Sequence, residues 1–246
     1  MGRDPSMESR LAFFSDVHGN TVALRAVLAD IKTQAVDGVY CLGDLVGYGP
    51  DPNGVVELLR SEGIPCLLGN YDDGVAFERG DCGCYFATDR AREIGEASYA
   101  FTATVLTEVN RAWLRNLPDE LHLQQGGIQL HLVHGSPRRI NEYLLENRDA
   151  RTYRRLAADE EADVLLFGHT HHPWHHRYGC VLFVNVGSAG RPTDGDPRPS
   201  FTVLALPSLE VEVRRVQYDV DATAAAVLAA GLPAELAEGF RGGTAA

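Results

Sequence analysis

Residues 11–20, LAFFSDVHGN, join a short apolar run to a group of polar and small residues. The run LAFFSD at 11–16 predicts a buried strand. Asn20 is suited to cap a following helix, and the apolar stripe of that helix consists of Val22, Leu24, Val27, Leu28 and Ile31. A strand that passes directly into a helix is typical of the opening unit of an α/β fold.

The next segment repeats this plan. The sequence GVYCLGD at 38–44 predicts a second strand, and NGVVELLRSEG at 53–63 predicts a helix that Gly63 ends. The stretch IPCLLGN at 64–70 predicts a third strand. Because strands alternate with helices, the fold class predicted here is α/β.

The rest of the chain adds a helical segment, hairpins and a helical tail. Residues 83–117 predict two helices, at 84–97 and 102–117, which we interpret as an insertion that can cover a site. The other predicted elements are hairpins at 120–135, 174–187 and 200–217, a helix near 149–160, a strand at 162–169, and helices at 221–231 and 233–240. We expect a disordered leader at 1–9 and one domain over 10–246.

The composition is that of a globular chain outside membranes. Hydrophobic residues make up 45% and charged residues 23%, and no apolar run approaches the roughly 18 residues of a membrane span. The N-terminal residues lack the apolar core of a secretory signal, and the five cysteines are scattered, so we expect a cytoplasmic location. We interpret Cys82 and Cys84 as free thiols in a loop, with metal binding or oxidation as the alternative.

The net charge of −12 disfavours broad contact with a nucleic-acid backbone, which Lys and Arg would have to neutralise. A small anionic substrate is compatible with this charge, because bound cations reverse the field locally. A homo-oligomer is also compatible with the sequence. The expected partner is therefore a small phosphorylated or otherwise anionic molecule, without extended nucleic acid and without a membrane.

Side chains that can bind metal ions follow five of the predicted strands. In chain order they are Asp16, His18, Asp44, Asn70, His134, His169 and His171. Ligands gather outside the carboxyl ends of strands in α/β sheets, so these distant residues can converge. Each alone has a simpler explanation as a helix cap, a turn residue or a core histidine. Their occurrence at five strand ends together favours a site.

Seven donors exceed the needs of one metal ion and fit two ions, about 3.5–4 Å apart, that share a bridging carboxylate. Carboxylate, amide and imidazole donors without a thiolate favour Mn, Fe, Zn, Ni or Mg, and we expect Mn. Two such ions can hold a hydroxide between them and stabilise the attacking and leaving oxygens at phosphorus. The predicted chemistry is hydrolysis of a phosphate ester or anhydride.

The stretch FGHTHHPWHH at 167–176 holds five of the nine histidines. Two of them, His169 and His171, directly follow a predicted strand, and their spacing in an extended segment predicts that both side chains point to one side. The other three, His172, His175 and His176, are interpreted as surface or rim residues. The run is therefore expected to contain two ligands and three bystanders.

The order of these motifs resembles the signature of the calcineurin-like metallophosphoesterases. The motifs are D-x-H at 16–18, GD at 43–44, GN-x-D at 69–72, the histidine of VHGSP and G-H-x-H at 168–171. Longer stretches, such as GDLVGYGPDPNGVV and NVGSAGRPTDGDPR, resemble the small bacterial and archaeal phosphodiesterase-type branch, and the likeness covers about residues 10–235. The resemblance implies two facing mixed β-sheets flanked by helices, a four-layer α/β/β/α sandwich, with a dinuclear site at the strand ends.

The resemblance also implies residue roles. Asp16, His18 and His171 would hold one metal ion, Asn70, His134 and His169 would hold the other, and Asp44 would bridge them. At the positive end of the first helix, Asn20 is placed to contact the substrate phosphate. Arg138 is a second candidate for phosphate binding, with a solvent-exposed loop arginine as the alternative.

One residue departs from the family pattern. Many members read G-N-H-[DE], where the histidine protonates the leaving group, whereas this chain has Tyr71 at that position. Tyrosine, with an ordinary pKa near ~10 against ~6.5 for histidine, is a weaker acid at neutral pH. Tyr71 is therefore a candidate catalytic residue, and we expect a preference for phosphodiesters or phosphoanhydrides, whose leaving groups need less protonation.

The function expected is that of a phosphodiesterase or a nucleotide-type phosphatase acting on a small molecule. A protein Ser/Thr phosphatase is a second interpretation, ranked lower because those relatives usually keep the histidine that Tyr71 replaces. A third interpretation is a non-catalytic scaffold, which uses the fold without the chemistry. The resemblance extends to a retromer subunit of related fold with such a role. Retention of all seven ligand positions argues against the scaffold.

Overall fold

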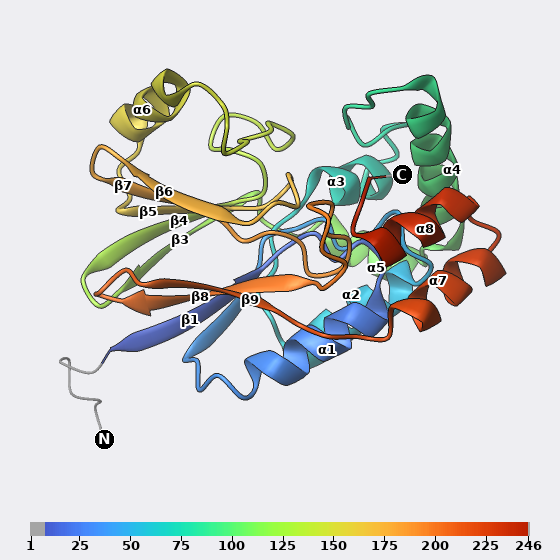
Figure 1. The fold of residues 1–246 in the computed structure, drawn as a ribbon, viewed down its shortest axis with the longest axis horizontal. Helices are drawn as coiled ribbons and strands as arrows, with labels where there is room; N and C mark the ends of the chain where they lie inside the picture. The colour runs from blue at the N-terminus through green and yellow to red at the C-terminus, as the bar shows by residue number, and fades with distance from the viewer. Residues whose placement is uncertain (1–7, 246) are drawn as a thin grey trace.

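The computed structural model describes residues 8–245, and two β-sheets that face each other form its centre (Figure 1). The first sheet has the strand order β2-β1-β8-β9. Its strands are β1 (Ser9–Phe14), β2 (Gly38–Cys41), β8 (Ser200–Leu206) and β9 (Val211–Arg215). Because β1 starts at Ser9, the leader predicted at 1–9 lies almost entirely outside the described residues.

The second sheet has five strands in the order β3-β4-β5-β7-β6. They are β3 (Glu120–Gln125), β4 (Ile128–Val133), β5 (Val164–Phe167), β6 (Trp174–Tyr178) and β7 (Val181–Asn185). β4, β5 and β7 run parallel, while β3 and β6 pair antiparallel at the two edges. The three predicted hairpins are confirmed in this sheet and in the β8–β9 pair.

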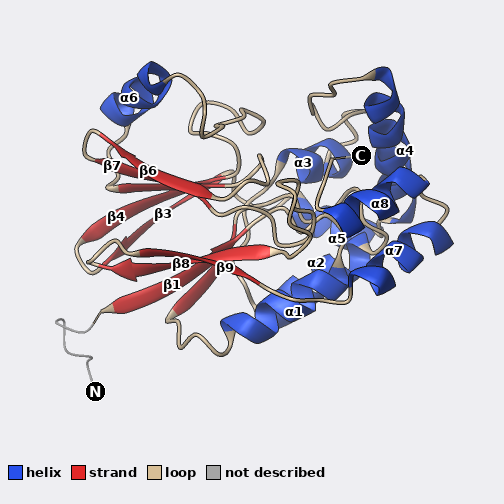
Figure 2. Ribbon diagram, in the orientation of Figure 1, coloured by secondary structure: helices blue, strands red, loops and turns tan. Residues whose placement is uncertain are grey.

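Alternation along β1 shows how the layers are built. Leu11 and Phe13 point into the core between the two sheets, whereas Ala12 and Phe14 pack on the opposite face. That opposite face is covered by α1 (Thr21–Ile31) and α2 (Pro52–Glu62) (Figure 2). Burial of each Leu or Phe side chain in this strand stabilises the fold by roughly 1.5–3 kcal/mol.

On the outer face of the five-stranded sheet lies α6 (Ala150–Asp159), whose Tyr153 and Leu156 are buried against Leu165 and Phe183. The layers are therefore helices, sheet, sheet and helix. This arrangement confirms the predicted four-layer α/β/β/α sandwich.

Local signals at two helix ends work as predicted. The side chain of Asn20 accepts a hydrogen bond from the Ala23 amide at the start of α1. At the end of α2, Gly63 takes a left-handed conformation with φ 65°. Glycine adopts this conformation without the steric cost that a Cβ would add.

The third strand predicted at 64–70 is wrong. Only a single bridge joins Cys66 to Cys41 of β2, and Asn70 instead begins a helix, α3 (Asn70–Ala76). The chain turns at Gly69, whose amide donates to the Asp72 carboxylate at 3.0 Å. This local bond satisfies the amide at the helix start, so the strand stops after one pairing.

The boundaries predicted for the two helices in 83–117 are also wrong, although both helices exist. α4 (Asp89–Val105) runs through the predicted break at 98–101, and α5 (Glu108–Leu114) follows it. The true break is set by Thr107, whose hydroxyl caps α5 by accepting from the Asn110 amide at 3.3 Å. The helices α7 (Val220–Ala229) and α8 (Ala234–Gly242) bury Ile94 of α4 and so hold it in place.

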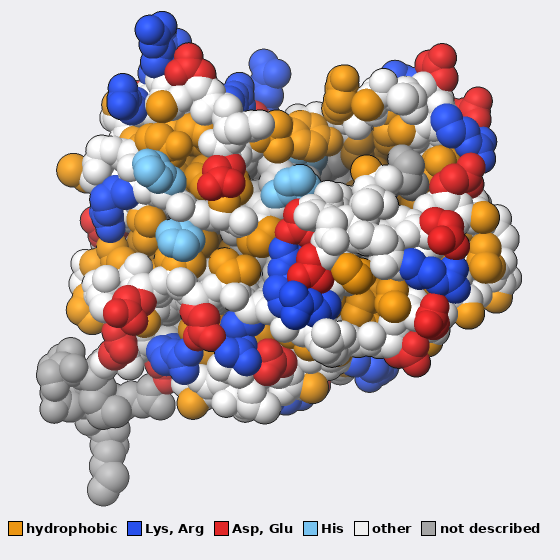
Figure 3. All heavy atoms as spheres, viewed as in Figure 1, with side chains coloured by type: hydrophobic (Ala, Val, Ile, Leu, Met, Phe, Trp, Pro, Cys, Tyr) orange, Lys and Arg blue, Asp and Glu red, His pale blue; other side chains and the backbone are white. Residues whose placement is uncertain are grey.

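Cys82 and Cys84 are joined by a disulfide, so the expectation of two free thiols is wrong. Their backbone loop brings the two Cα atoms within 5.3 Å, a separation that permits the bond. Among the helices of residues 8–245, none is long and apolar enough to cross a membrane. On the face shown in Figure 3, the described Lys and Arg side chains are interspersed with Asp and Glu and form no continuous basic surface.

Candidate metal centre

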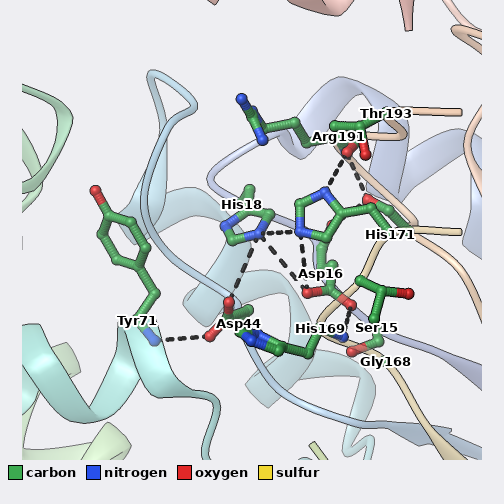
Figure 4. Close-up of polar contacts among 12 residues, drawn as sticks. Ser15, Asp16, His18, Asp44, Tyr71, Gly168, His169, His171, Arg191 and Thr193 are labelled. Carbon is green, nitrogen blue, oxygen red and sulfur yellow. Dashed lines mark hydrogen bonds and ion pairs between the residues drawn. The ribbon is translucent and has the colours of Figure 1, made fainter. Parts of the chain in front are cut away.

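Two groups of metal-ligand side chains lie side by side where the strand ends of both sheets meet (Figure 4). The first group is Asp16, His18 and His171, and the second is Asp44, His134 and His169. Within each group the candidate ligand atoms lie within 4.8 Å of one another, and all six residues are buried. The structure thus brings together residues that are far apart in the chain, such as Asp16 and His171, which are separated by 155 positions.

The carboxylate of Asp44 lies between the two groups. Its Oδ2 is 3.7 Å from Nε2 of His18 in the first group and 3.4 Å from Nε2 of His134 in the second. The amide oxygen of Asn70, the seventh predicted ligand, is 3.0 Å from Nε2 of His134. One carboxylate oxygen is therefore within reach of both groups, as a bridging ligand requires.

Three of the histidines are oriented by backbone carbonyls. Nδ1 of His18 lies 3.0 Å from the oxygen of Val46, and Nδ1 of His134 lies 2.8 Å from that of Leu42. Nδ1 of His171 lies 2.6 Å from the oxygen of Arg191. Because a carbonyl only accepts, each Nδ1 carries the hydrogen, and in the neutral ring Nε2 keeps its lone pair toward the centre.

Two buried ligand atoms at this centre lack a hydrogen-bond partner, and a bound cation would supply one. Oδ1 of Asp16 and Nε2 of His169 have no hydrogen-bond partner and no access to solvent. The other Asp16 oxygen accepts from the His169 amide at 2.9 Å, and Oδ1 of Asp44 accepts from the Tyr71 amide at 2.8 Å. Buried polar atoms are normally paired. The free oxygens and nitrogens therefore fit two divalent ions held by oxygen and nitrogen donors.

The backbone at this centre is strained. Positive φ angles occur at Asp16 (57°), His18 (49°), Asp44 (52°), His169 (64°) and His171 (62°). Residues other than glycine seldom adopt this conformation, and each instance costs of order 1–3 kcal/mol. Such strain is typical of functional sites, where surrounding contacts hold a side chain in an otherwise unfavourable direction.

These angles correct one expectation. The segment that carries His169 and His171 is left-handed rather than extended, so the predicted reason for their common direction is wrong. Instead, His171 reaches the group of Asp16, and His169 reaches the group of Asp44. The predicted bystanders, His172, His175 and His176, are exposed.

Close backbone contacts require glycine beside the ligands. A Cβ at Gly69 would lie 2.1 Å from the Asp44 amide nitrogen, and one at Gly190 would lie 1.8 Å from the Val17 carbonyl oxygen. Neither neighbour is a flexible side chain that could move away. The strand ends can therefore approach each other only because these positions lack a side chain.

Charge interactions within the centre separate the histidine pKa values. Burial alone would lower the pKa of His134, but Asp44 and Asp16 outweigh it and raise that pKa to about 9. Burial, with a contribution from His171, lowers the pKa of His18 to about 3. For His169, burial and the neighbouring His134 lower the pKa to about 4. In the metal-free protein at neutral pH, the imidazoles of His18 and His169 are therefore neutral and ready to accept a metal ion.

The hydroxyl end of the Tyr71 side chain points away from this centre (Figure 4), and the ring lies edge-on to that of His18 with 6.0 Å between the centroids. Its ring is buried beside Tyr48 and Tyr99, and its hydroxyl shares a 2.8 Å hydrogen bond with Ser98. Burial also raises the pKa of the hydroxyl well above its ordinary value. The contribution of Tyr71 that the structure shows is its backbone amide, which orients Asp44.

Asn20 is fully engaged inside the protein. Its oxygen accepts from the Ala23 amide and from the Thr223 hydroxyl, each at 3.0 Å, and its nitrogen donates to the Gly190 carbonyl at 2.8 Å. The residue is only 1% exposed. A contact with substrate phosphate would require these bonds to open.

Arg138 lies apart from the metal centre. It is exposed and pairs with the Glu142 carboxylate, beside a second surface pocket that Arg139 and Arg148 also line. The structure therefore does not bring Arg138 together with the seven metal-ligand candidates.

Two further residues belong to the centre, although neither was predicted to do so. The carboxylate of Asp72 accepts from the amides of Leu45, Val46 and Gly69 at 2.9–3.1 Å, which fastens the Asp44 loop to the start of α3. Arg191 extends its buried guanidinium over the Tyr48 ring, with 4.0 Å between the guanidinium carbon and the ring centroid. Two sequence signals were available for them: Asp72 lies two positions after Asn70, and Arg191 follows the glycine of the NVGSAGRP stretch.

A cavity of about 290 Å³ opens onto the centre. Its polar side is formed by metal-ligand candidates together with Arg191. Its apolar side is formed by the loop before α4 and the first turns of that helix, with Tyr85, Phe86 and Ile94. Tyr143 completes the wall, and its ring lies 4.1 Å from that of His169 between centroids. The loop before α4 and the start of α4 thus form one wall of the cavity.

Comparison with known proteins agrees with this geometry. Residues 10–208 match the model of the calcineurin-like phosphoesterase superfamily domain. The chain belongs to this superfamily. The family uses divalent metal ions, and the chain is a metallophosphoesterase, a phosphoric ester hydrolase, as the motifs predicted.

Individual relatives cover most of the chain. An uncharacterized protein of Methanocaldococcus jannaschii is 30% identical over 94% of this chain and 97% of its own length. The phosphodiesterase YfcE of Escherichia coli is 26% identical over 76% of this chain and 83% of its own. The crystal structure of a metallophosphoesterase from Sphaerobacter thermophilus, 29% identical, superposes with a TM-score of 0.80 over 97% of this chain and 100% of that one.

Proposed function

We propose that this metallophosphoesterase hydrolyses small phosphodiesters or nucleotide-type phosphoanhydrides with two divalent metal ions. The observation that carries the proposal is the pair of buried, unpaired ligand atoms, Oδ1 of Asp16 in one group and Nε2 of His169 in the other, with the Asp44 carboxylate within reach of both groups. We place the enzyme in the cytoplasm, because the number of cysteines is odd and three of them, Cys41, Cys66 and Cys180, form no disulfide.

In the proposed site, each ion has a ligand set drawn from one group. Asp16, His18 and His171 would hold the first ion, Asn70, His134 and His169 the second, and Asp44 both. When bound, such ions polarise a phosphoryl oxygen and supply a nucleophile at neutral pH. The donor set suits Mn, Fe, Zn, Ni or Mg, and we propose Mn as the native metal.

The residues of the chain itself would bind the phosphate and exclude water. The guanidinium of Arg191 lines the same cavity as His18 and His171 and makes no hydrogen bond to another described residue. A planar cation in this place can donate two hydrogen bonds to phosphate oxygens. We therefore assign phosphate binding to Arg191, while Asn20 positions the start of α1.

The leaving-group preference follows from what faces the cavity. The hydroxyl of Tyr71 is bonded to Ser98 and does not line the cavity, so it is not placed to protonate a leaving alkoxide. Substrates whose leaving groups are already stable anions need no such proton. Phosphodiesters with aryl or nucleotide leaving groups and phosphoanhydrides meet this requirement, and simple alkyl monoesters do not.

The shape of the cavity supports a small molecule rather than a protein substrate. A volume of about 290 Å³ is that of a small ligand site, and its wall of Tyr85, Phe86 and Ile94 suits an aromatic or apolar group next to the phosphate. A phosphoserine on a folded protein offers no such group. The scaffold interpretation requires no cavity at all.

The test compares substrates on the Mn-loaded protein. We expect aryl phosphodiesters and dinucleoside polyphosphates to be hydrolysed faster than alkyl monoesters, and Asp44→Asn to abolish turnover and reduce bound metal. Arg138→Ala is the matched control, because this exposed charge lies outside the cavity, and it should retain full activity. Faster hydrolysis of alkyl monoesters, or full activity in Asp44→Asn, would overturn the proposal.

A further inference from the structure

A third group of ligand side chains lies outside the metal centre, on the hairpin of β3 and β4. Glu120 and His122 are two residues apart in β3 and so face the same side of the sheet. His131 in β4 is the direct cross-strand partner of His122. The two imidazole rings stack, with centroids 4.2 Å apart and an angle of 20° between the planes.

The nitrogen and oxygen atoms of this group converge. Nε2 of His131 is 3.1 Å from one oxygen of Glu120, and Nε2 of His122 is 3.5 Å from the other. The candidate ligand atoms of these three residues all lie within 4.8 Å of one another. The spacing is that of a site in which a small ion could bind all three.

A fourth residue orients the central histidine. The carboxylate of Glu160, at the end of α6, is 2.9 Å from Nδ1 of His131. An imidazole whose Nδ1 is bonded to a carboxylate presents Nε2 in a fixed direction and is a better metal ligand. His131 is 5% exposed, so its ring is also held by packing.

Access differs across the group. The side chains of Glu120 and His122 are 52% and 62% exposed, so an ion can enter from solvent and water can complete its coordination. Two imidazoles and one carboxylate with an open position are donors typical of zinc. Mg²⁺ and Ca²⁺ prefer oxygen ligands, and they fit this group less well.

We propose that Glu120, His122 and His131 form a third divalent-cation site, selective for Zn²⁺ over Mg²⁺ and Ca²⁺, with Glu160 as its positioning residue. The site joins the edge strand β3 to β4 and, through Glu160, to α6. An edge strand is paired on one side only, so an ion that crosslinks it would reduce its fraying. No part of this proposal depends on the function of the dinuclear centre.

The experiment counts Zn²⁺ ions bound per chain. The full-length protein is stripped with EDTA, saturated with Zn²⁺, passed through a desalting column and analysed for metal and protein. We expect the double variant Glu120→Gln/His122→Gln to bind one Zn²⁺ fewer than the unchanged protein. The difference of one ion is expected whether the dinuclear centre holds two ions or none.

The matched control replaces two exposed histidines on the opposite edge strand of the same sheet. His175→Gln/His176→Gln removes two imidazoles from β6, one more than the test variant removes from β3, and should leave the Zn²⁺ count unchanged. Circular dichroism establishes that both variants fold. An equal Zn²⁺ count in Glu120→Gln/His122→Gln and the unchanged protein, or the same loss in the control, would overturn the proposal.

Discussion

At the scale of single residues, the guanidinium of Arg191 is proposed to bind the substrate without binding a metal ion, so its replacement can test substrate binding alone. It lies over Tyr48 and lines the cavity, whereas its carbonyl accepts from His171. Replacing the side chain therefore removes the cation and keeps the backbone contact. We expect Arg191→Ala to lower kcat/KM for a phosphodiester by roughly 10²-fold, as removal of one charge-stabilising donor commonly does.

Metal analysis and steady-state kinetics together check this expectation. Arg191→Ala should retain the metal content of the unchanged protein, because its effect is on the substrate. Arg138→Ala removes the same charge from the surface outside the cavity. Equal losses in the two variants would show that the general charge of the protein, and not the position of Arg191, matters.

A second prediction at this scale concerns Tyr71. Its hydroxyl is bonded to Ser98 at 2.8 Å and points away from the metal centre. Tyr71→Phe should keep kcat within about twofold and lower the free energy of unfolding by about 1 kcal/mol, the contribution of one buried hydrogen bond. General acids contribute roughly 10² to 10⁴ in rate. A loss of that size in Tyr71→Phe would restore the catalytic role first considered for this residue.

At the scale of elements, the sequence predicted what periodicity and capping determine. The β1–α1 unit, α2 with its Gly63 end, and the three hairpins depend on signals within a few residues, and all are present. The helix α3 was not predicted, although the bond from the Gly69 amide to Asp72 at its start is local; the same carboxylate also accepts from the distant amides of Leu45 and Val46. Contacts between residues 27 positions apart are invisible to local patterns.

The candidate site divides in the same way. Ligand types at strand ends identified the seven metal-ligand candidates, and the structure brings these side chains together. The positions of the Tyr71 and Arg191 side chains could not be predicted, since tertiary packing decides that one lines the cavity and the other does not. Left-handed backbone at His169 and His171 could not be predicted either, because it arises from tertiary contacts and not from the residues themselves.

The hairpin of β3 and β4 carries a pH-dependent contribution to stability. Burial opposes protonation of His131, but Glu160 and Glu120 outweigh it and raise its pKa above the ordinary value of 6.5. A raised pKa means that the contribution is complete below pH 6.5 and is lost as the pH rises through the pKa of the folded protein. The pKa of Glu160 is lowered below 4.5, although burial opposes this, so its share is lost only in acid.

The difference in unfolding free energy between the unchanged protein and His131→Gln isolates this contribution. In the presence of EDTA, we expect that difference to be largest between about pH 5 and 6.5 and to shrink as the pH rises further. Each unit by which the pKa is raised corresponds to about 1.4 kcal/mol. Urea unfolding at several pH values measures it, and a difference that grows above pH 6.5 would contradict the assignment of His131 as the titrating group.

At the scale of the whole molecule, the proposed metal ions would tie the two sheets together. Asp16 and Asp44 follow β1 and β2 of the four-stranded sheet, whereas His134 and the pair His169 and His171 follow β4 and β5 of the five-stranded sheet. Each group takes ligands from both sheets. Without ions, Oδ1 of Asp16 and Nε2 of His169 are buried with no hydrogen-bond partner, which disfavours the closed arrangement.

Metal removal should therefore lower the thermal stability of the entire fold and not only its activity. Binding to the folded state alone stabilises it by about 2.7 kcal/mol for each site at a free metal concentration of 100 times Kd. For a chain of this size, each kcal/mol shifts Tm by roughly 2–4 °C, so two occupied sites raise Tm by roughly 10–20 °C. Calorimetry with Mn²⁺ and with EDTA measures the shift, and Mn²⁺ is used because the hairpin site favours Zn²⁺.

The decisive comparison uses His171→Gln, which removes one ligand from the first group and leaves the hairpin unchanged. Its Tm with Mn²⁺ should fall toward that of the EDTA-treated protein, because the group of Asp16 can no longer bind tightly. The double variant Glu120→Gln/His122→Gln should keep the full Mn²⁺-dependent shift. A Tm that is the same with Mn²⁺ and with EDTA would mean that the strand ends of the two sheets are held by packing alone, and the dinuclear assignment would then be wrong.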